Sequence, residues 1–167
     1  LVGVEGDYYV VSTGEGGSGG AGSTVTTGGS GGHPCVHIDN PFNKHLDYIV
    51  GHDPYSVVAA DLDGDQLPDL VSANLGNFNG DTVSVLPSRG SGTFGPKKDL
   101  QVGLGPIGVA AADLDKDGDL DLVTVNLVSD NASVLLNQGE GMFSAHVDFW
   151  TGDNPSAVAL ADLDGDG

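Results

Sequence analysis

The stretch Asp113-Leu-Asp-Lys-Asp-Gly-Asp-Leu-Asp121 places carboxylates at positions 1, 3, 5 and 9 of a nonapeptide and a glycine at position 6. Carboxylates packed this closely repel one another and cannot all stay ionised without a counter-charge. Calcium supplies that charge and takes six to eight oxygen ligands at about 2.3–2.6 Å from side chains, backbone carbonyls and water. The stretch therefore predicts a calcium loop, with side-chain ligands Asp113, Asp115, Asp117 and Asp121 and the backbone carbonyl of Asp119.

Two further stretches repeat this pattern with differences. In Asp61-Leu-Asp-Gly-Asp-Gln-Leu-Pro-Asp69, Gln66 stands where a glycine is expected, which predicts a looser turn and weaker calcium binding. The stretch Asp162-Leu-Asp-Gly-Asp-Gly167 stops at position 6, so we expect an incomplete site there. The predicted ligands are the side chains of Asp61, Asp63, Asp65 and Asp69 with the carbonyl of Leu67 in the first stretch, and Asp162, Asp164 and Asp166 in the second.

These loops differ from the calcium loop of an EF-hand. Position 12, where an EF-hand has a bidentate glutamate, is Ser72 in one stretch and Thr124 in another. The segments that follow, Leu70-Val-Ser-Ala and Leu122-Val-Thr-Val, favour strand over helix because they are rich in aliphatic and β-branched residues. Each loop is therefore expected to join two strands.

Four landmarks recur along the chain at fixed spacing, which indicates a tandem repeat. The acidic loops begin at residues 61, 113 and 162, which are 52 and 49 residues apart. Each loop follows a Gly-x-x-Pro segment, and a phenylalanine and an aspartate come before that glycine at constant distances. The landmarks are Gly51, Gly103 and Gly152; Pro54, Pro106 and Pro155; Phe42, Phe94 and Phe143; and Asp47, Asp99 and Asp148.

Alternation of apolar and polar residues predicts four short strands for each repeat. Such a unit is typical of a propeller blade. We therefore expect an all-β fold of four-stranded antiparallel blades of the β-propeller type, about three repeat units in number, open or part of a larger array. The predicted strands are 70–74, 82–86, 98–102 and 107–112, followed by 122–126, 132–137, 146–151 and 156–161.

The repeats divide the chain into three predicted units. The first spans 1–69 and includes a glycine-rich insertion at 17–41; the second spans 70–121; the third spans 122–167 and is truncated in its calcium loop. The chain begins just after position 9 of a loop and stops at position 6 of another, so about three residues would join end to start in phase. This phasing predicts a slice of a longer array or a unit that continues into a neighbour.

Charge and composition limit the function classes. The net charge is −19, and twelve of the 24 acidic residues lie in the three loops, so much of the acidity is attributed to ligands. Only five basic residues argue against nucleic acid and anionic membrane as partners, and no stretch is long and apolar enough for membrane insertion. Calcium sites of ordinary affinity fill where calcium is millimolar, which favours an extracellular or cell-surface location.

Other chemistry is weakly supported. A nucleophile elbow, a paired-glutamate site and a phosphate loop are all missing from the sequence, so catalysis is not expected. His33, Cys35 and His37 are residue types that bind zinc, but their spacing fits none of the usual structural patterns. Asn131 opens an Asn-x-Ser sequon, the form of an N-glycosylation acceptor.

The combined motifs resemble the FG-GAP repeat, the integrin α-type repeat also called VCBS. Its pattern couples an aromatic-Gly turn, a Gly-x-x-Pro segment and an Asp-x-Asp-x-Asp-Gly-x-x-Asp calcium loop. Phe94-Gly95 matches the first element, whereas Phe143-Ser144 and Phe42-Asn43 depart from it at the glycine. The resemblance implies a seven-bladed propeller with calcium in outer loops of some blades.

Three functions are consistent with this resemblance. The first is an extracellular calcium-binding structural or adhesive module that joins other copies of itself or further repeats, extending to a head-to-tail fibre. The second is a lectin-like propeller that binds a protein or glycan ligand, in which aromatic residues such as Tyr55 and Trp150 stack on sugars. The third is a non-catalytic accessory domain of a secreted enzyme.

Overall fold

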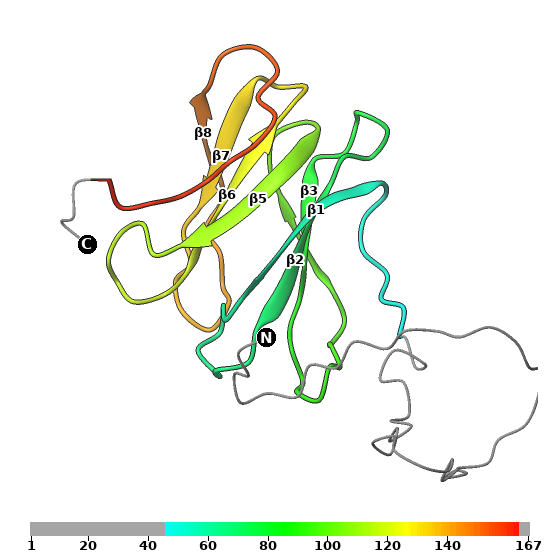
Figure 1. The fold of residues 1–167 in the computed structure, drawn as a ribbon, viewed down its shortest axis with the longest axis vertical. Coiled ribbons are helices and arrows are strands. Elements are labelled where there is room, and N and C mark those ends of the chain that lie inside the picture. The colour runs from blue at the N-terminus through cyan, green and yellow to red at the C-terminus, as the bar shows by residue number, and fades with distance from the viewer. Residues whose placement is uncertain (1–45, 164–167) are drawn as a thin grey trace, which may run out of the picture. The chain divides into compact units, whose positions relative to one another are not determined.

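The computed structural model describes residues 46–163, which form two four-stranded antiparallel sheets and no helix (Figure 1). Sheet 1 has the order β1 (Pro54–Ala60), β2 (Asp69–Asn74), β3 (Thr82–Leu86) and β4 (Lys98–Gln101). Sheet 2 has the order β5 (Pro106–Ala112), β6 (Asp121–Asn126), β7 (Asn131–Leu135) and β8 (Val147–Trp150). The insertion at 17–41, His33, Cys35, His37, Asp164 and Asp166 lie outside the described residues.

The predicted fold class is confirmed. Both sheets consist of sequential antiparallel strands, they do not close into a ring, and they are consistent with propeller blades. β1 and β5 each begin at the proline of the Gly-x-x-Pro segment, where a proline is tolerated because it opens an edge strand. No helix in residues 46–163 meets the length and apolarity needed to cross a bilayer.

The hydrogen-bonded sheets do not coincide with the four-strand units predicted from the sequence repeat. The first four predicted strands fall in two sheets, because the strand at Pro106–Ala112 opens sheet 2 instead of closing sheet 1. This strand forms a hairpin with β6 through the acidic loop, in the same register as β1 with β2. The acidic loop is therefore an internal turn of each sheet, between its first and second strands.

The predicted strand over 156–161 is wrong, since residues 151–163 contain no strand. The corresponding strands of the two sheets, β1 and β5, each pair with the strand that follows their acidic loop. Among residues 46–163, none of the eight strands pairs with residues 156–161.

A single hydrophobic core runs through both sheets. β2 and β6 lie inside their sheets and are almost entirely buried, whereas the outer strands β4 and β8 are largely exposed. β5 packs against β1 and β2, as Figure 1 shows. The core residues are Leu62, Val71, Ala73, Val83, Val85, Val102, Val109, Leu122 and Leu135.

Leu62, at position 2 of the first acidic loop, ties that loop to sheet 2. Its side chain is 1% exposed and belongs to the shared core. Its backbone carbonyl accepts a 2.8 Å hydrogen bond from Nδ2 of Asn137, which lies beyond the end of β7. Nδ2 of Asn137 also donates to the carbonyl of Leu120, in the second loop, at 3.1 Å. One buried amide therefore fixes the two acidic loops relative to each other.

We expect Leu62→Ala to lower the free energy of unfolding by about 2–5 kcal/mol, because it leaves a cavity in this shared core. Leu114→Ala is the matched control, since Leu114 occupies the same loop position in sheet 2 but is 41% exposed. Urea denaturation followed by circular dichroism measures both. Equal losses in the two variants would contradict the inter-sheet role of Leu62.

Candidate metal site

The carboxylate at position 1 shapes the backbone of each acidic loop. In loop 1 (residues 61–69), Oδ1 of Asp61 accepts the N–H of Gly64 and Oδ2 accepts the N–H of Gln66, both at 2.8 Å. In loop 2 (residues 113–121), the two oxygens of Asp113 accept the matching N–H groups of positions 4 and 6 at 2.7 and 3.0 Å. The two loops therefore adopt the same turn.

This turn brings the carboxylates of positions 1, 3 and 5 together. In each loop the three side chains offer ligand oxygens that all lie within 4.8 Å of one another. Two oxygens bound to one calcium ion at about 2.4 Å are at most about 4.8 Å apart, so both groups fit a single ion. The groups are Asp61, Asp63 and Asp65 in loop 1, and Asp113, Asp115 and Asp117 in loop 2.

The carboxylates at position 9 have a different environment. Asp69 and Asp121 are buried, whereas the residues at positions 1, 3 and 5 are exposed or partly so. Oδ2 of Asp121 accepts the N–H of Leu114 at 2.8 Å, and Oδ1 accepts the N–H of Asn137 at 2.8 Å. Position 9 therefore fastens the start of its loop to the end of β7.

Loop 1 repeats this arrangement. Asp69 accepts the N–H groups of Leu62 and Ser88 at 3.2 and 2.6 Å. Neither Asp69 nor Asp121 belongs to the close groups of three carboxylates, although each oxygen keeps a second lone pair. Their ligand role, like that of the Leu67 and Asp119 carbonyls, stays a prediction. Sequence reasoning missed the structural role of Asp69 and Asp121, because the residues whose N–H groups they accept, Ser88 and Asn137, are distant in sequence.

The electrostatics of the loops favour a cation. Burial raises the pKa of Asp69, assisted by the carboxylates of Asp63 and Asp65, and the bonds from the Ser88 and Leu62 N–H groups only partly offset this rise. Desolvation also raises the pKa of Asp115, together with the carboxylates of Asp117, Asp121 and Asp113.

Position 6 of the loops tests the expectation of a looser turn at Gln66. Gln66 has a φ of 69° and Gly118 a φ of 99°, so both residues adopt positive φ values. Gln66 keeps its bond to Asp61, and the turn is therefore not opened. Because Gln66 carries a Cβ where a glycine is expected, its left-handed backbone conformation costs about 1–2 kcal/mol of conformational free energy.

We expect Gln66→Gly to raise the free energy of unfolding by about 1 kcal/mol, because glycine adopts this φ without a steric penalty. Gly118→Ala is the reciprocal variant and should lower it by about 1 kcal/mol or more. Urea melts without calcium measure both changes. No gain in Gln66→Gly alongside a loss in Gly118→Ala would show that the glutamine side chain contributes contacts that outweigh the strain.

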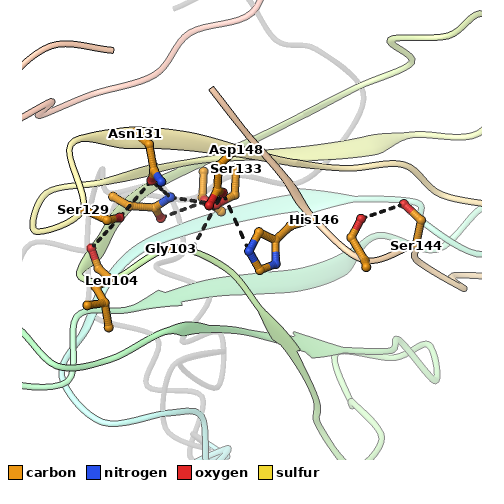
Figure 2. A network of polar contacts seen from close by, with 11 residues as sticks. Gly103, Leu104, Ser129, Asn131, Ser133, Ser144, His146 and Asp148 are labelled. Atoms are coloured by element: carbon orange, nitrogen blue, oxygen red, sulfur yellow. Dashed lines mark hydrogen bonds and ion pairs between the residues drawn. The ribbon is translucent and has the colours of Figure 1, made fainter. Parts of the chain in front are cut away.

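A buried polar network closes the opposite end of each sheet, and Figure 2 shows the one in sheet 2. In sheet 2, Nδ2 of Asn126 donates to Oγ of Ser133 at 2.8 Å, and this hydroxyl donates to Oδ1 of Asp148 at 2.6 Å. The N–H of Gly103 donates to the same Ser133 hydroxyl at 2.9 Å. Sheet 1 repeats these contacts with Asn74, Ser84, Asp99 and Gly51.

This network explains two of the recurring landmarks. A Cβ on Gly103 would lie 2.6 Å from Nδ2 of Asn126, and one on Gly51 would lie 2.3 Å from Cγ of Asn74, so neither position has room for a side chain. Two of the landmark aspartates, Asp99 and Asp148, accept a hydrogen bond from the serine hydroxyl of their sheet. Asn131 also joins the network, because its Oδ1 accepts bonds from Asn126 and Ser129 at 2.8 and 2.9 Å.

Asp99 and Asp148 each have a basic neighbour two residues earlier in the sequence. Lys97 forms an ion pair with Asp99, and Nε2 of His146 lies 3.7 Å from Oδ1 of Asp148. Burial by itself raises the pKa of Asp99, but hydrogen bonds from Lys97 and Ser84 outweigh it and lower the pKa overall. These contacts give Lys97 and His146 a structural role beside the aspartates.

Comparison with known families identifies part of this architecture. Residues 61–124, which run from loop 1 through β2 to β5 and on into β6, match the family model described as an FG-GAP-like repeat. The chain therefore contains an FG-GAP-like repeat, as its motifs predicted. Repeats of this family are typically non-catalytic modules that carry acidic metal-binding loops. No curated protein and no solved structure matches the chain.

Proposed function

We propose that this protein is an extracellular, calcium-stabilised structural module whose sheets stack with other copies of itself or with further repeats. The observation that carries the proposal is the presence of two loops of the same geometry, each with three carboxylates whose ligand atoms lie within 4.8 Å of one another. Oxygen-rich groups of this kind suit hard cations such as calcium.

Within each loop, some carboxylates would bind the ion and another attaches the loop to the sheet. Asp113, Asp115 and Asp117 would hold the ion, and the buried Asp121 fastens the loop to the sheet. A bound calcium ion supplies positive charge that offsets the repulsion among these carboxylates. Because the loop joins the first and second strands of the sheet, free energy of calcium binding becomes in part free energy of folding.

Isothermal titration calorimetry of the full chain tests the calcium site, with magnesium as the competing ion. We expect calcium to bind in both described loops and more tightly than magnesium, which demands near-octahedral geometry and dehydrates reluctantly. Asp63→Asn and Asp115→Asn should each abolish one binding event and leave the other. A titration with no calcium heat at millimolar concentration would overturn the proposal.

Glycan binding is a second candidate, favoured by exposed aromatic residues. Trp150 is 75% exposed at the end of β8, and Phe149 beside it and Tyr55 on β1 are also exposed. Aromatic faces at the surface suit stacking on sugar rings. A glycan array probed with the wild type and Trp150→Ala decides this candidate, since a lectin should lose its bound spots in the variant.

A further inference from the structure

Three connecting segments line a cavity of about 500 Å³ at the end of the sheets opposite the acidic loops. β2 and β6 begin at those loops and end at two of the connections, residues 75–81 and 127–130 (Figure 1). The third segment comprises residues 153–154. The volume lies within the range of about 300–1,000 Å³ that small-ligand sites have. The residues that line the cavity are Phe78, Leu127, Val128, Asp130, Asp153 and Asn154.

The connection between β2 and β3 presents an aromatic ring to this cavity. It is seven residues long (75–81), whereas the equivalent connection between β6 and β7 has four (127–130). Gly76, Asn77 and Phe78 have φ values of 59°, 52° and 66°, and the Phe78 side chain is 58% exposed. A bulky residue at positive φ is strained, and such strain is concentrated at binding sites. The longer connection therefore holds an exposed ring in a costly conformation beside a cavity.

Hydrogen bonds fix this connection to the segment before β1. The N–H of Leu75 donates to the carbonyl of Asp53 at 3.0 Å, and Oδ2 of Asp53 accepts the N–H of Asn77 at 2.8 Å. The N–H of Gly76 donates to the carbonyl of His52 at 3.0 Å. A loop held in this way does not have to become ordered when a ligand binds, which lowers the free-energy cost of binding.

The other walls combine aliphatic side chains with hydrogen-bond acceptors. Oδ1 of Asp130 accepts the N–H of Asn154 at 2.7 Å, and a carboxylate has about four lone-pair sites, so Asp130 keeps capacity for further donors. The neighbouring Asp153 is exposed. Among residues 46–163, no lysine, arginine or histidine lines the cavity. The cavity therefore offers acceptors and an aromatic ring, with no cation to hold an anionic ligand.

We propose that this cavity binds a neutral sugar ring. A pyranose has a face of C–H groups and a rim of hydroxyls. The C–H face suits the ring of Phe78, and the hydroxyls donate to the carboxylates of Asp130 and Asp153 in charge-assisted hydrogen bonds. Acidic sugars are disfavoured by these carboxylates and by the net charge of −19. The inference rests on the glycan-binding candidate above and assigns the sugar to residues other than Trp150.

Amide NMR spectra of the full chain test the ligand class. The neutral probes are the methyl glycosides of glucose, galactose and mannose; glucuronate is the anionic probe and methylguanidinium the cationic one. We expect at least one neutral glycoside to shift the amide signals of Phe78, Asp130 and Asn154, and to bind about tenfold more tightly than glucuronate. Tighter binding of methylguanidinium than of every neutral glycoside would overturn the proposal, as would no shift with any neutral glycoside at millimolar concentration.

Variants of the aromatic ring test the position of the sugar. Phe78→Ala should weaken binding about tenfold, whereas Phe78→Tyr retains the aromatic face and should stay within about threefold of the wild type. Phe149→Ala is the matched control, because Phe149 is 56% exposed but does not line the cavity. Circular dichroism checks that each variant is folded. Equal losses in Phe78→Ala and Phe149→Ala would overturn the assignment to this cavity.

Asp153→Asn tests the polar wall, since it replaces a charged acceptor with a neutral one of the same shape. We expect it to weaken binding about fivefold, because hydrogen bonds to ionised acceptors are the stronger ones. Glu140→Gln removes the same charge from an exposed residue that does not line the cavity, and it should leave binding unchanged. If both variants weaken binding equally, net charge rather than a contact with the sugar is responsible.

The glycan array separates this inference from the broader glycan candidate. Binding that falls in Phe78→Ala and persists in Trp150→Ala supports the cavity. Binding that persists in Phe78→Ala and falls in Trp150→Ala overturns the cavity and leaves the glycan candidate intact. An array without bound spots for the wild type overturns both, and calorimetry with calcium reads the metal sites independently.

Discussion

Asp121→Ala should lower the free energy of unfolding by about 2–6 kcal/mol, even without calcium. The carboxylate is fully buried and accepts the N–H groups of Leu114 and Asn137, both at 2.8 Å. Alanine leaves both donors without an acceptor, and each unsatisfied buried group costs about 1–3 kcal/mol. The measurement is urea denaturation with a calcium chelator present, followed by circular dichroism.

Asp119→Ala is the control from the same loop. Asp119 is only partly buried, and its predicted contribution is a backbone carbonyl, which alanine retains. We expect its unfolding free energy to change by less than about 1 kcal/mol. Asp121→Asn should fall between the two, because one amide oxygen replaces two carboxylate oxygens. If the two alanine variants unfold at the same urea concentration, the buried hydrogen bonds are not what holds this loop to its sheet.

Removing calcium should lower the melting temperature by about 10–20 °C. A ligand at a hundredfold excess over its dissociation constant stabilises the folded state by about 2.7 kcal/mol for each site, so two sites give about 5 kcal/mol. For a protein of this size, 1 kcal/mol corresponds to about 2–4 °C. Differential scanning calorimetry with calcium and then with excess chelator measures the shift.

A double variant, Asp63→Asn with Asp115→Asn, provides the control for this shift. It removes one ligand from each close group of carboxylates and one negative charge from each loop. We expect chelation to leave its melting temperature unchanged. The wild-type shift should also persist at about 0.5 M sodium chloride, because screening weakens exposed charge interactions without replacing a coordinated ion. A shift that sodium chloride reproduces would show that general screening, rather than calcium coordination, stabilises the loops.

The strands within residues 69–150 were predictable from the sequence because their signals are local. Alternation and β-branching placed β2, β3, β4, β5, β6 and β8 within one residue of their observed bounds and β7 within two, whereas β1 was not among the predicted strands. The strand predicted at 156–161 has the same local pattern but is absent. Strand formation depends on a partner, and a pattern within one segment does not supply one.

The candidate site was predictable to a similar extent. The spacing of Asp113, Asp115 and Asp117 predicted that their carboxylates converge, and they do. The sequence did not reveal that Asp121 is buried under two backbone N–H groups, because one of them belongs to Asn137 at the end of another strand. The asparagine-serine network was also not predicted, because its members are distant in sequence. The recurring Gly103 was a sign of this network, since it donates to Ser133 and has no room for a side chain beside Asn126.

The position of Leu62 has a consequence for how such an array unfolds. Its side chain is carried by a loop of sheet 1 but is packed in the core that it shares with sheet 2. Neither sheet is therefore a separate folding unit, and each neighbour adds an interface term to its stability. An array of these sheets should fray from its ends, and its interior should exchange amide hydrogens far more slowly than its terminal members. The cooperative length of the array, rather than any one sheet, would then set its mechanical and proteolytic resistance.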